Sequence, residues 1–280
     1  SRSVRTRFGI DTLVDQKLFD ELDNHARAIL GKSVVLRKFA CWFGPFDEFI
    51  YFDADILVFR DQKDVFDLLA EYDIVYTGDG RIPGLERAFT ESALQRNVFT
   101  QEEVNQRLNA GFFASKKGVL EHAQLMSLLE EAAAVPDIFD PRQRDQGIIN
   151  YVVLKAIPSK RAHLRDFAPA IPDEVVAAAP GNIRIKKDKA YKTYAGRDVP
   201  ARFIHWLGLH RCAGDPASYP YVDLWLRYRY PGAIGFVQRS LVRTWWLVSR
   251  LLCAHDEGWY TPSYQLKRAK RIVSRWTAPQ

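Results

Sequence analysis

The feature that most constrains the fold is an alternation of short apolar runs with longer amphipathic segments. Four apolar runs have the length of a strand, at residues 49–52, 73–76, 111–114 and 203–206. Three longer segments repeat apolar side chains at helical spacing, at residues 17–30, 119–134 and 145–155. Strands that alternate with helices favour a layered arrangement. We therefore predict an α/β fold, with a mixed, mostly parallel sheet flanked by helices.

The composition excludes several classes of protein. The chain has 280 residues, of which 47% are hydrophobic and 26% are charged. A disordered linker would be depleted in apolar and aromatic residues, and this length suffices for one large domain with an appendage. Lys and Arg number 40 against 34 Asp and Glu, so the net charge is +6. Dedicated nucleic-acid binders carry a much denser basic face, so no nucleic-acid partner is expected.

The positive charge is concentrated toward the C-terminal end. Residues 227–280 contain ten Lys and Arg against only Asp256 and Glu257, so this segment carries +8 and the remainder −2. Five of the seven Trp also lie at residue 225 or later. This shift predicts a body at residues 1–214 and a basic, Trp-rich helical tail at residues 215–280.

Two interpretations of the tail stay open. A basic helix with Trp and Leu on its other side suits an anionic membrane surface, whereas a helix packed on the body would turn its Arg side chains to water. Residues 233–253 are interrupted by three Arg, so they fall short of the roughly 18 apolar residues of a membrane span. Three widely spaced Cys do not suggest a disulfide framework. We expect a cytoplasmic chain, peripheral on the inner face of the membrane if the tail binds lipid.

Two carboxylates follow the first apolar run. Asp53 and Asp55 come directly after residues 49–52, and carboxylates spaced in this way can both reach one divalent cation. Mn²⁺ and Mg²⁺ prefer carboxylate oxygen and leave coordination positions for substrate phosphate. The pair alone is a weak signal, because Asp is also common in a turn after a strand.

Three later segments strengthen the interpretation as a metal site. Residues 108–113 (LNAGFF), 145–150 (DQGIIN) and 203–211 (FIHWLGLHR) follow in this order. Together with the carboxylate pair they resemble the retaining glycosyltransferases of the GT-A fold, and most closely family 8, which includes the glycogenins and bacterial galactosyltransferases. The resemblance covers residues 36–211. It implies a metal-dependent hexosyltransferase that uses a nucleotide-diphosphate sugar and retains the anomeric configuration.

The resemblance implies a role for residues around the metal and the diphosphate. Asp53 and Asp55 match the family's carboxylate pair, which holds Mn²⁺ on the donor diphosphate, and His205 matches the third protein ligand. Gly208 and Arg211 match a glycine and a lysine that hold the diphosphate. Arginine in place of lysine still supplies a permanent charge and a fork for phosphate oxygens.

The resemblance also implies a sugar site. Asn109, Ala110 and Gly111 match a segment near the donor sugar, where a glycine lets a ligand approach the backbone closely. Asp145 and Gln146 match the catalytic pair beside the anomeric carbon. They are expected to orient the sugar while the acceptor hydroxyl attacks on the face that the diphosphate leaves.

Other parts of the family pattern are matched more loosely. Arg37 or Lys38 stands where the family has a basic residue that faces the donor, and Ala54 is assigned to the donor site as the residue between the two carboxylates. Family members begin with a nucleotide-binding strand well before the carboxylate pair, whereas residues 1–10 contain no such strand. We therefore expect a missing or unusual base site and assign no base-binding residue.

Two other functions compete with a glycosyltransferase. Phosphatases of the haloacid dehalogenase type also place two such carboxylates after an apolar strand, but they favour Thr or Val where Leu57 stands. A non-catalytic sheet protein could dock on a membrane or a partner through its basic tail. If the chain is a transferase, its acceptor is expected to be a glycan or a lipid-linked sugar.

Overall fold

The computed structural model describes the greater part of the first 205 residues and a few later ones. The described residues are 15–31, 34–54, 56–77, 88–140, 145–167, 175–176, 183–186, 189–194, 197–205, 226, 235–241 and 244. The chain divides into two compact units, residues 1–53 with 61–169, and residues 54–60 with 170–280. The boundary predicted near residue 215 lies outside the described residues, so the separate tail stays a prediction.

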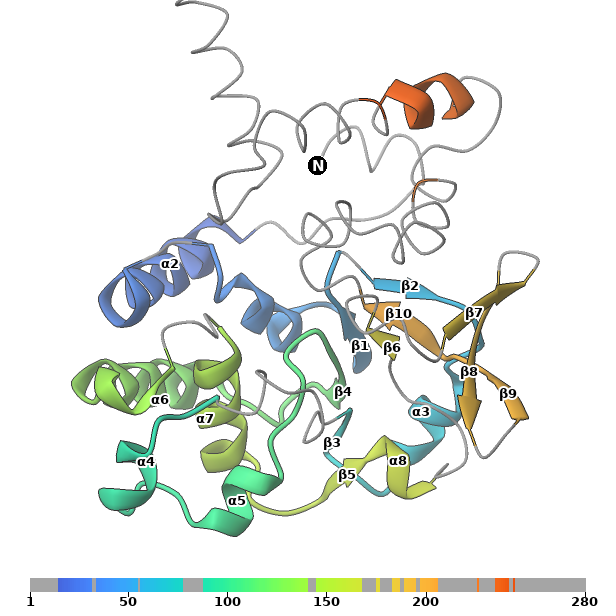
Figure 1. Ribbon diagram of the computed structural model, residues 1–280. Helices are drawn as coiled ribbons and strands as arrows, with labels where there is room; N and C mark the ends of the chain where they lie inside the picture. The colour runs from blue at the N-terminus through green and yellow to red at the C-terminus, as the bar shows by residue number, and fades with distance from the viewer. Residues whose placement is uncertain are drawn as a thin grey trace, which may run out of the picture. The chain divides into compact units, whose positions relative to one another are not determined.

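A four-stranded sheet organises the first unit (Figure 1). Its strand order is β1-β4-β3-β5. The strands are β1 (Glu48–Phe52), β4 (Phe112–Lys116), β3 (Ile74–Tyr76) and β5 (Arg161–His163). Strand β4 pairs antiparallel with both β1 and β3, and β3 pairs parallel with β5. The C-terminal ends of β1, β3 and β5 therefore lie at the same end of the sheet as the start of β4.

We predicted a mixed, mostly parallel sheet. The pairing is mixed, but most pairs of described strands are antiparallel, so the second part of the prediction was wrong. Parallel pairing joins only β3 to β5, and β10 (Phe203–His205) to β6 (Val175–Val176), among the strands that are described. The reason is the place of β4, which lies between β1 and β3 and runs against both. Both pairings of β4, with β1 and with β3, are therefore antiparallel.

The three longest described helices lie on one side of this sheet (Figure 1). The longest are α2 (Gln16–Leu30), α6 (His122–Ala134) and α7 (Gln146–Ala156). Helix α2 begins where the Asp15 side chain accepts a hydrogen bond from the Leu18 backbone at 3.0 Å, and it ends at Gly31, which has a left-handed φ of 64°. The predicted helices are confirmed, although α6 begins three residues later than expected because Gly118, at φ 80°, turns the chain first.

Shorter helical segments connect the main elements. A 3₁₀ helix, η1 (Arg37–Phe43), precedes β1, and another, η2 (Pro136–Ile138), follows α6. The remaining short helices are α3 (Lys63–Leu68), α4 (Ser92–Gln95), α5 (Gln101–Asn105) and α8 (Leu164–Phe167). Helices α4 and α5 lie between β3 and β4 along the chain.

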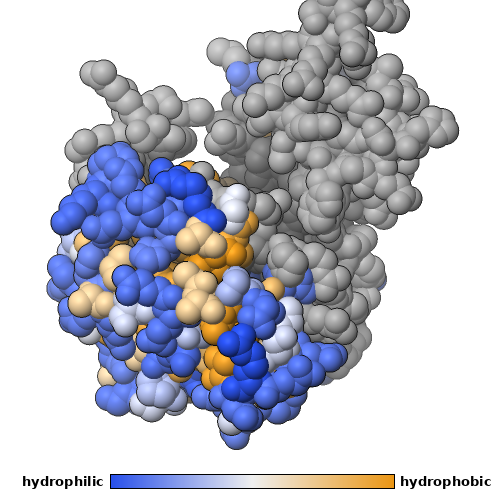
Figure 2. All heavy atoms as spheres, turned by 90° about the vertical axis from the view of Figure 1, so that its left-hand side faces the viewer, coloured by the Kyte–Doolittle hydropathy of each residue, from blue (hydrophilic) through white to orange (hydrophobic). Residues whose placement is uncertain are grey.

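The core of the first unit lies between the sheet and its helices. Fully buried side chains from every layer contribute, among them Leu22 of α2, Phe113 of β4, Leu125 of α6 and Ile149 of α7. Each such side chain contributes roughly 1.5–3 kcal/mol by leaving water. The outer side of the helices, turned toward the viewer in Figure 2, is mostly hydrophilic where it is described. This amphipathic division explains why the periodicity in the sequence located the helices correctly.

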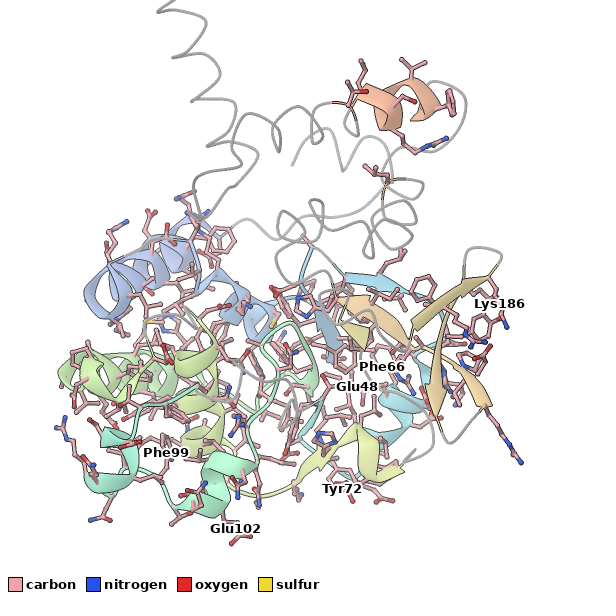
Figure 3. All side chains as sticks on the ribbon, in the orientation of Figure 1. Glu48, Phe66, Tyr72, Phe99, Glu102 and Lys186 are labelled. Atoms are coloured by element: carbon pink, nitrogen blue, oxygen red, sulfur yellow. The ribbon has the colours of Figure 1, made fainter. Side chains whose placement is uncertain are left out.

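The described part of the second unit forms two small sheets. One has the strand order β2-β10-β6, in which β2 (Ile56–Val58) pairs antiparallel with β10, so that Ile56 faces His205. The other is formed by β7 (Ile183–Lys186), β8 (Lys189–Tyr194) and β9 (Arg197–Pro200) in sequence order. Lys186, labelled in Figure 3, pairs with Asp198 of β9 at 2.7 Å. The strand predicted at residues 203–206 is confirmed as β10.

Little of the predicted tail is described. Residues 235–241 are helical, and Phe236, Val237 and Leu241 are exposed there. The guanidinium of Arg239 lies 5.8 Å from the ring centroid of Phe236. Within the part of the chain that the structure describes, no helix has the length and apolarity to cross a membrane.

Candidate functional site

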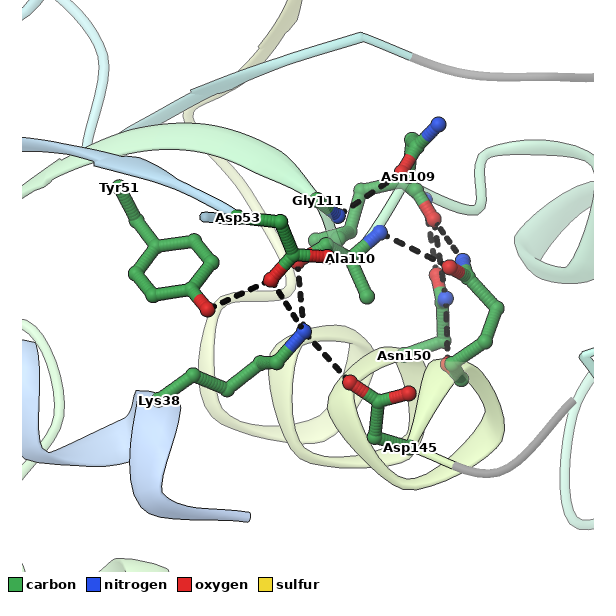
Figure 4. A network of polar contacts seen from close by, with 10 residues as sticks. Lys38, Tyr51, Asp53, Asn109, Ala110, Gly111, Asp145 and Asn150 are labelled. Atoms are coloured by element: carbon green, nitrogen blue, oxygen red, sulfur yellow. Dashed lines mark hydrogen bonds and ion pairs between the residues drawn. The ribbon is translucent and has the colours of Figure 1, made fainter. Parts of the chain in front are cut away.

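Segments that the sequence marked separately meet at one end of the four-stranded sheet (Figure 4). Asp53 follows β1, residues 109–111 lead into β4, and Asp145 stands at the start of α7. The backbone N–H of Asp53 donates to the carbonyl of Gly111 at 2.9 Å and extends the pairing of β1 with β4. Two motifs more than fifty residues apart are thus fixed side by side by the sheet itself.

Lys38 of η1 joins these segments. Its Nζ atom lies 2.5 Å from Asp145 Oδ2 and 3.2 Å from Asp53 Oδ1, and it donates to the carbonyl of Ala110 at 3.1 Å. The Lys38 side chain is 7% exposed, whereas the Asp53 and Asp145 side chains are 30% and 23% exposed. Burial alone would lower the pKa of Lys38, but the negative charges of Asp145 and Asp53 outweigh it and raise that pKa. The site therefore contains a permanent cation between two carboxylates that water can reach.

Tyr51 adds a hydrogen bond that the sequence analysis missed. Its hydroxyl donates to Asp53 Oδ1 at 2.6 Å, and the ammonium of Lys38 lies 5.2 Å from its ring centroid. Burial, together with the charge of Asp53, raises the pKa of Tyr51, so the phenol keeps its proton and remains a donor. A signal was present in the sequence, because residues two apart on a strand point to the same face.

Two carboxamides of α7 hold the segment that leads into β4. Gln146 Oε1 accepts from the Ala110 backbone at 2.8 Å, and Gln146 Nε2 donates to the carbonyl of Leu108. Asn150 Oδ1 accepts from the Leu108 backbone at 2.8 Å, while its Nδ2 donates to the carbonyls of Leu108 at 3.0 Å and Gln146 at 2.8 Å. Residues four apart share one helix face. Gln146 and Asn150 therefore grip one stretch of backbone together, a role for Asn150 that the sequence analysis did not assign.

Asn109 shapes the same stretch from within. Its side-chain oxygen accepts from the Gly111 backbone at 2.8 Å, and its own N–H donates to the carbonyl of Thr77 at 2.7 Å. Asn commonly makes such a bond to the backbone two residues on. The three residues predicted to lie near the donor sugar thus form one ordered turn beside Asp53.

Gly147 allows α7 to begin where it does. A Cβ atom at this position would lie 2.6 Å from the carbonyl oxygen of Ala88 and 2.9 Å from Cδ1 of Phe139. Both approaches are shorter than side chains tolerate, so the first turn of α7 fits closely only as glycine. The glycine thereby sets the position of Asp145 and Gln146.

Arg37 and Lys38, the two basic residues considered for the donor site, make different contacts. The guanidinium of Arg37 pairs with Asp23 of α2, with Nη2 2.6 Å from Oδ2 and Nε 3.0 Å from Oδ1. This bond from Arg37 lowers the pKa of Asp23. Lys38 is the basic residue that meets Asp53 and Asp145.

The metal ligands implied by the resemblance lie in different parts of the chain. Asp53 belongs to the first unit and the buried His205 to the second, while Asp55, Gly208 and Arg211 lie outside the described residues. Within the described ranges, no three His, Cys, Asp or Glu side chains gather as a cation site. A carboxylate that water reaches and an imidazole are nevertheless donors that suit Mn²⁺ or Mg²⁺. Ala54, assigned to the donor site, is exposed directly after Asp53.

Comparison with known proteins gives a distant likeness to a solved structure. No protein-family model and no curated protein matches the chain. Among solved structures it is similar to that of the galactosyltransferase LgtC in complex with donor and acceptor sugar analogs, with 15% sequence identity and a TM-score of 0.39. The match covers 72% of this chain, and the chain spans 65% of the length of that one. A likeness this distant does not assign a function, which has to be inferred from the site itself.

Proposed function

We propose that the chain is a metal-dependent glycosyltransferase that moves a hexose from a nucleotide-diphosphate sugar to an acceptor hydroxyl with retention of configuration. One observation supports this most strongly. The segments around Asp53, Asn109 and Asp145 match the family pattern separately in the sequence, and they converge with Lys38 on one polar network. If these segments were only polar turns and helix starts, their side chains would not be expected to share one buried lysine.

The donor diphosphate would be bound through a cation and through the chain's own charges. Asp53, Asp55 and His205 would hold Mn²⁺ or Mg²⁺, and the bound cation supplies Lewis-acid stabilisation of the leaving diphosphate. Arg211 would add hydrogen bonds to phosphate oxygens, and Gly208 would let the phosphates approach the backbone. The charge of Lys38 offsets one of the two negative charges of Asp53 and Asp145, so the cluster carries a net charge of about −1. This remaining negative charge would attract a cation.

The sugar would lie against the start of α7. Each bond to the backbone uses only part of the Gln146 carboxamide, which keeps one acceptor position on its oxygen and one N–H for a ligand. The carboxylate of Asp145, held by Lys38, would stabilise positive charge that develops at the anomeric carbon. An acceptor hydroxyl that attacks on the face of the departing diphosphate gives retention without a strong protein nucleophile.

A screen of donor hydrolysis tests the proposal. Wild-type protein is incubated with Mn²⁺ and each of several nucleotide sugars, and release of the nucleoside diphosphate is measured. We expect release from at least one donor and its loss in Asp55→Ala. The matched control is Asp61→Ala, which removes an exposed carboxylate bonded to the Lys63 backbone at 2.8 Å. Undiminished hydrolysis by Asp55→Ala, or an aspartyl-phosphate formed at Asp53, would contradict the proposal.

We infer that the chain acts in the cytoplasm at an anionic membrane, where a lipid-linked or glycan acceptor would be presented. The supporting observations are the +8 charge of residues 227–280 and the exposed Phe236, Val237 and Leu241. We expect Phe236→Ser to reduce co-sedimentation with vesicles that contain phosphatidylserine. The control Phe66→Ser changes an exposed Phe of α3, labelled in Figure 3, and should have no effect. Equal binding by wild type and Phe236→Ser would count against the membrane role.

A further inference from the structure

Tyr51 stands at the end of a buried stack of aromatic rings. The ring of Trp42 stacks on Phe113 with 4.8 Å between centroids and 14° between planes. Phe113 in turn stacks on Tyr51, at 5.0 Å and 17°. These rings come from η1, β4 and β1, so three elements fix the plane of the tyrosine ring. Stacked pairs of this kind stabilise the fold beyond the effect of the area that they bury.

The other end of the stack is tied to the backbone. Trp42 Nε1 donates to Ser115 Oγ at 3.1 Å, and Ser115 Oγ donates to the carbonyl of Asp73 at 2.8 Å. Trp42 and Ser115 are both fully buried. Because the indole can neither tilt nor slide without breaking these bonds, the position of the Tyr51 hydroxyl is set by the whole column.

The Tyr51 hydroxyl contacts Asp53, the carboxylate that we propose as a cation ligand. Tyr51 donates to Asp53 Oδ1 at 2.6 Å, and the Lys38 ammonium lies 3.2 Å from the same oxygen. Asp53 directly follows the last residue of β1. Two donors of different origin on one oxygen therefore restrict the rotation of this carboxylate far more than the ion pair alone would.

We propose that Tyr51 is a positioning residue, which holds the Asp53 carboxylate in the single orientation from which it can bind a divalent cation. This inference rests on the proposed function, because it gives Tyr51 a purpose only if Asp53 is a cation ligand. Tyr51 acts through Asp53 and is not itself a catalytic residue. Hydrogen-bond partners that orient metal ligands typically change metal affinity by 10- to 100-fold when they are removed.

The alternative is that Tyr51 only fills the core. The substitution Tyr51→Phe separates the two roles, because it keeps the stacked ring and removes only the hydroxyl. A packing role predicts unchanged cation binding in this variant. A positioning role predicts weaker binding with the ring stack intact.

The matched control is Tyr151→Phe. Tyr151 of α7 also lies in the core of the first unit, and its hydroxyl lies 3.4 Å from Glu131 Oε2. The substitution therefore removes the same atom from the same kind of environment without touching Asp53. Any loss of cation binding caused only by removing a tyrosine hydroxyl from the core would appear in both variants.

The experiment measures Mn²⁺ binding by calorimetry and by electron paramagnetic resonance, with inorganic pyrophosphate as a diphosphate that carries no base. We expect Tyr51→Phe to weaken the binding of Mn²⁺ about 10- to 100-fold, with Tyr151→Phe equal to wild type and all three proteins folded by near-ultraviolet circular dichroism. Equal affinity in Tyr51→Phe and wild type would overturn this inference and leave the proposed function intact. No Mn²⁺ binding by the wild type would overturn both.

Discussion

The two ends of the four-stranded sheet each carry a lysine paired with aspartate, yet the two pairs differ in kind. At the proposed site, Lys38 is 7% exposed and contacts two carboxylates and a carbonyl. At the opposite end, the Lys116 ammonium lies 3.0 Å from Asp73 Oδ1, and the two side chains are 27% and 29% exposed. This second pair borders a pocket of about 520 Å³, between the end of β4 and the end of α7.

The proposed site is thus distinguished by a buried lysine that contacts several segments, and not by the volume of a neighbouring pocket. An exposed ion pair contributes about 0–1 kcal/mol and tolerates either partner's loss. A buried lysine is costly unless its charge is balanced, so its retention between Asp53 and Asp145 calls for an explanation beyond stability. The binding of a charged donor provides one.

The largest effect is expected from removing each lysine in turn. Lys38→Met leaves Asp53 and Asp145 without their shared cation, so the free energy of unfolding should fall by about 3 kcal/mol. Lys116→Met should change it by less than about 1 kcal/mol. Urea unfolding monitored by tryptophan fluorescence measures both. Equal losses in the two variants would remove the distinction between the two ends.

A second variant sharpens that result. Lys38→Met combined with Asp145→Asn removes one of the two carboxylates that lost their partner, so the double variant should recover part of the lost stability. A double variant no more stable than Lys38→Met would show that packing, and not charge, made the lysine important.

A smaller loss of stability is expected from removing the Asn150 side chain, which hydrogen-bonds the backbone before β4. Asn150→Ala leaves the buried N–H of Leu108 without its acceptor, which should lower the free energy of unfolding by about 2 kcal/mol. Hydrogen exchange should speed up at the Leu108 amide, while the amides of β4 near Lys116 keep their protection. Gln106→Ala, which removes a partner of Arg161 on the surface, is the control. Unchanged exchange at Leu108 would contradict the role assigned to Asn150.

A loss of about 1.5 kcal/mol is expected from crowding the start of α7. Gly147→Ala places a methyl group against the Ala88 carbonyl and should displace Asp145 from Lys38. Gly118→Ala, at the other end of the sheet, strains a left-handed residue but meets no atom within 4 Å. Both variants should lose stability, but only Gly147→Ala should weaken donor hydrolysis. Equal hydrolysis by the two would argue against the placement of α7 as a determinant of the site.

The smallest effect concerns the neighbouring Arg37. Its bond lowers the pKa of Asp23, so the stability that this pair contributes is present above the unfolded pKa of about 3.9 and is lost as the pH falls through the folded value. Asp23→Asn should therefore be slightly less stable than wild type at pH 6, with the gap closing below about pH 4. Thermal unfolding across this range measures the gap. A gap that is constant with pH would show that the ion pair is not its source, and donor hydrolysis should be unaffected throughout.

The sequence predicted well those features that depend on local patterns. The apolar run before Asp53 became β1, and the periodicity of residues 145–155 became α7, because burial of one face dictates both. The strands β2 and β5 were missed, since three residues provide too little pattern to recognise. The mostly parallel pairing was wrong because pairing depends on which strand β4 lies beside, which no local pattern encodes.

The sequence marked Lys38, Asp53 and Asp145 separately, but it did not predict that these residues contact one another. Arg37 and Lys38 are both basic, and only their successive directions on a 3₁₀ helix decide which one reaches Asp53. Tyr51 and Asn150 were missed because their partners are an adjacent carboxylate and a backbone segment brought close by the fold. The sequence did not predict roles that depend on contacts between different helices and strands.

Amide hydrogen exchange with and without Mn²⁺ and a panel of nucleotide sugars tests most directly whether the network around Lys38 is the donor site. We expect at least one donor to increase protection at residues 108–112 and 145–150, with no change at residues 116–119 beside the pocket. Protection confined to residues 116–119, or no change with any donor, would contradict the account.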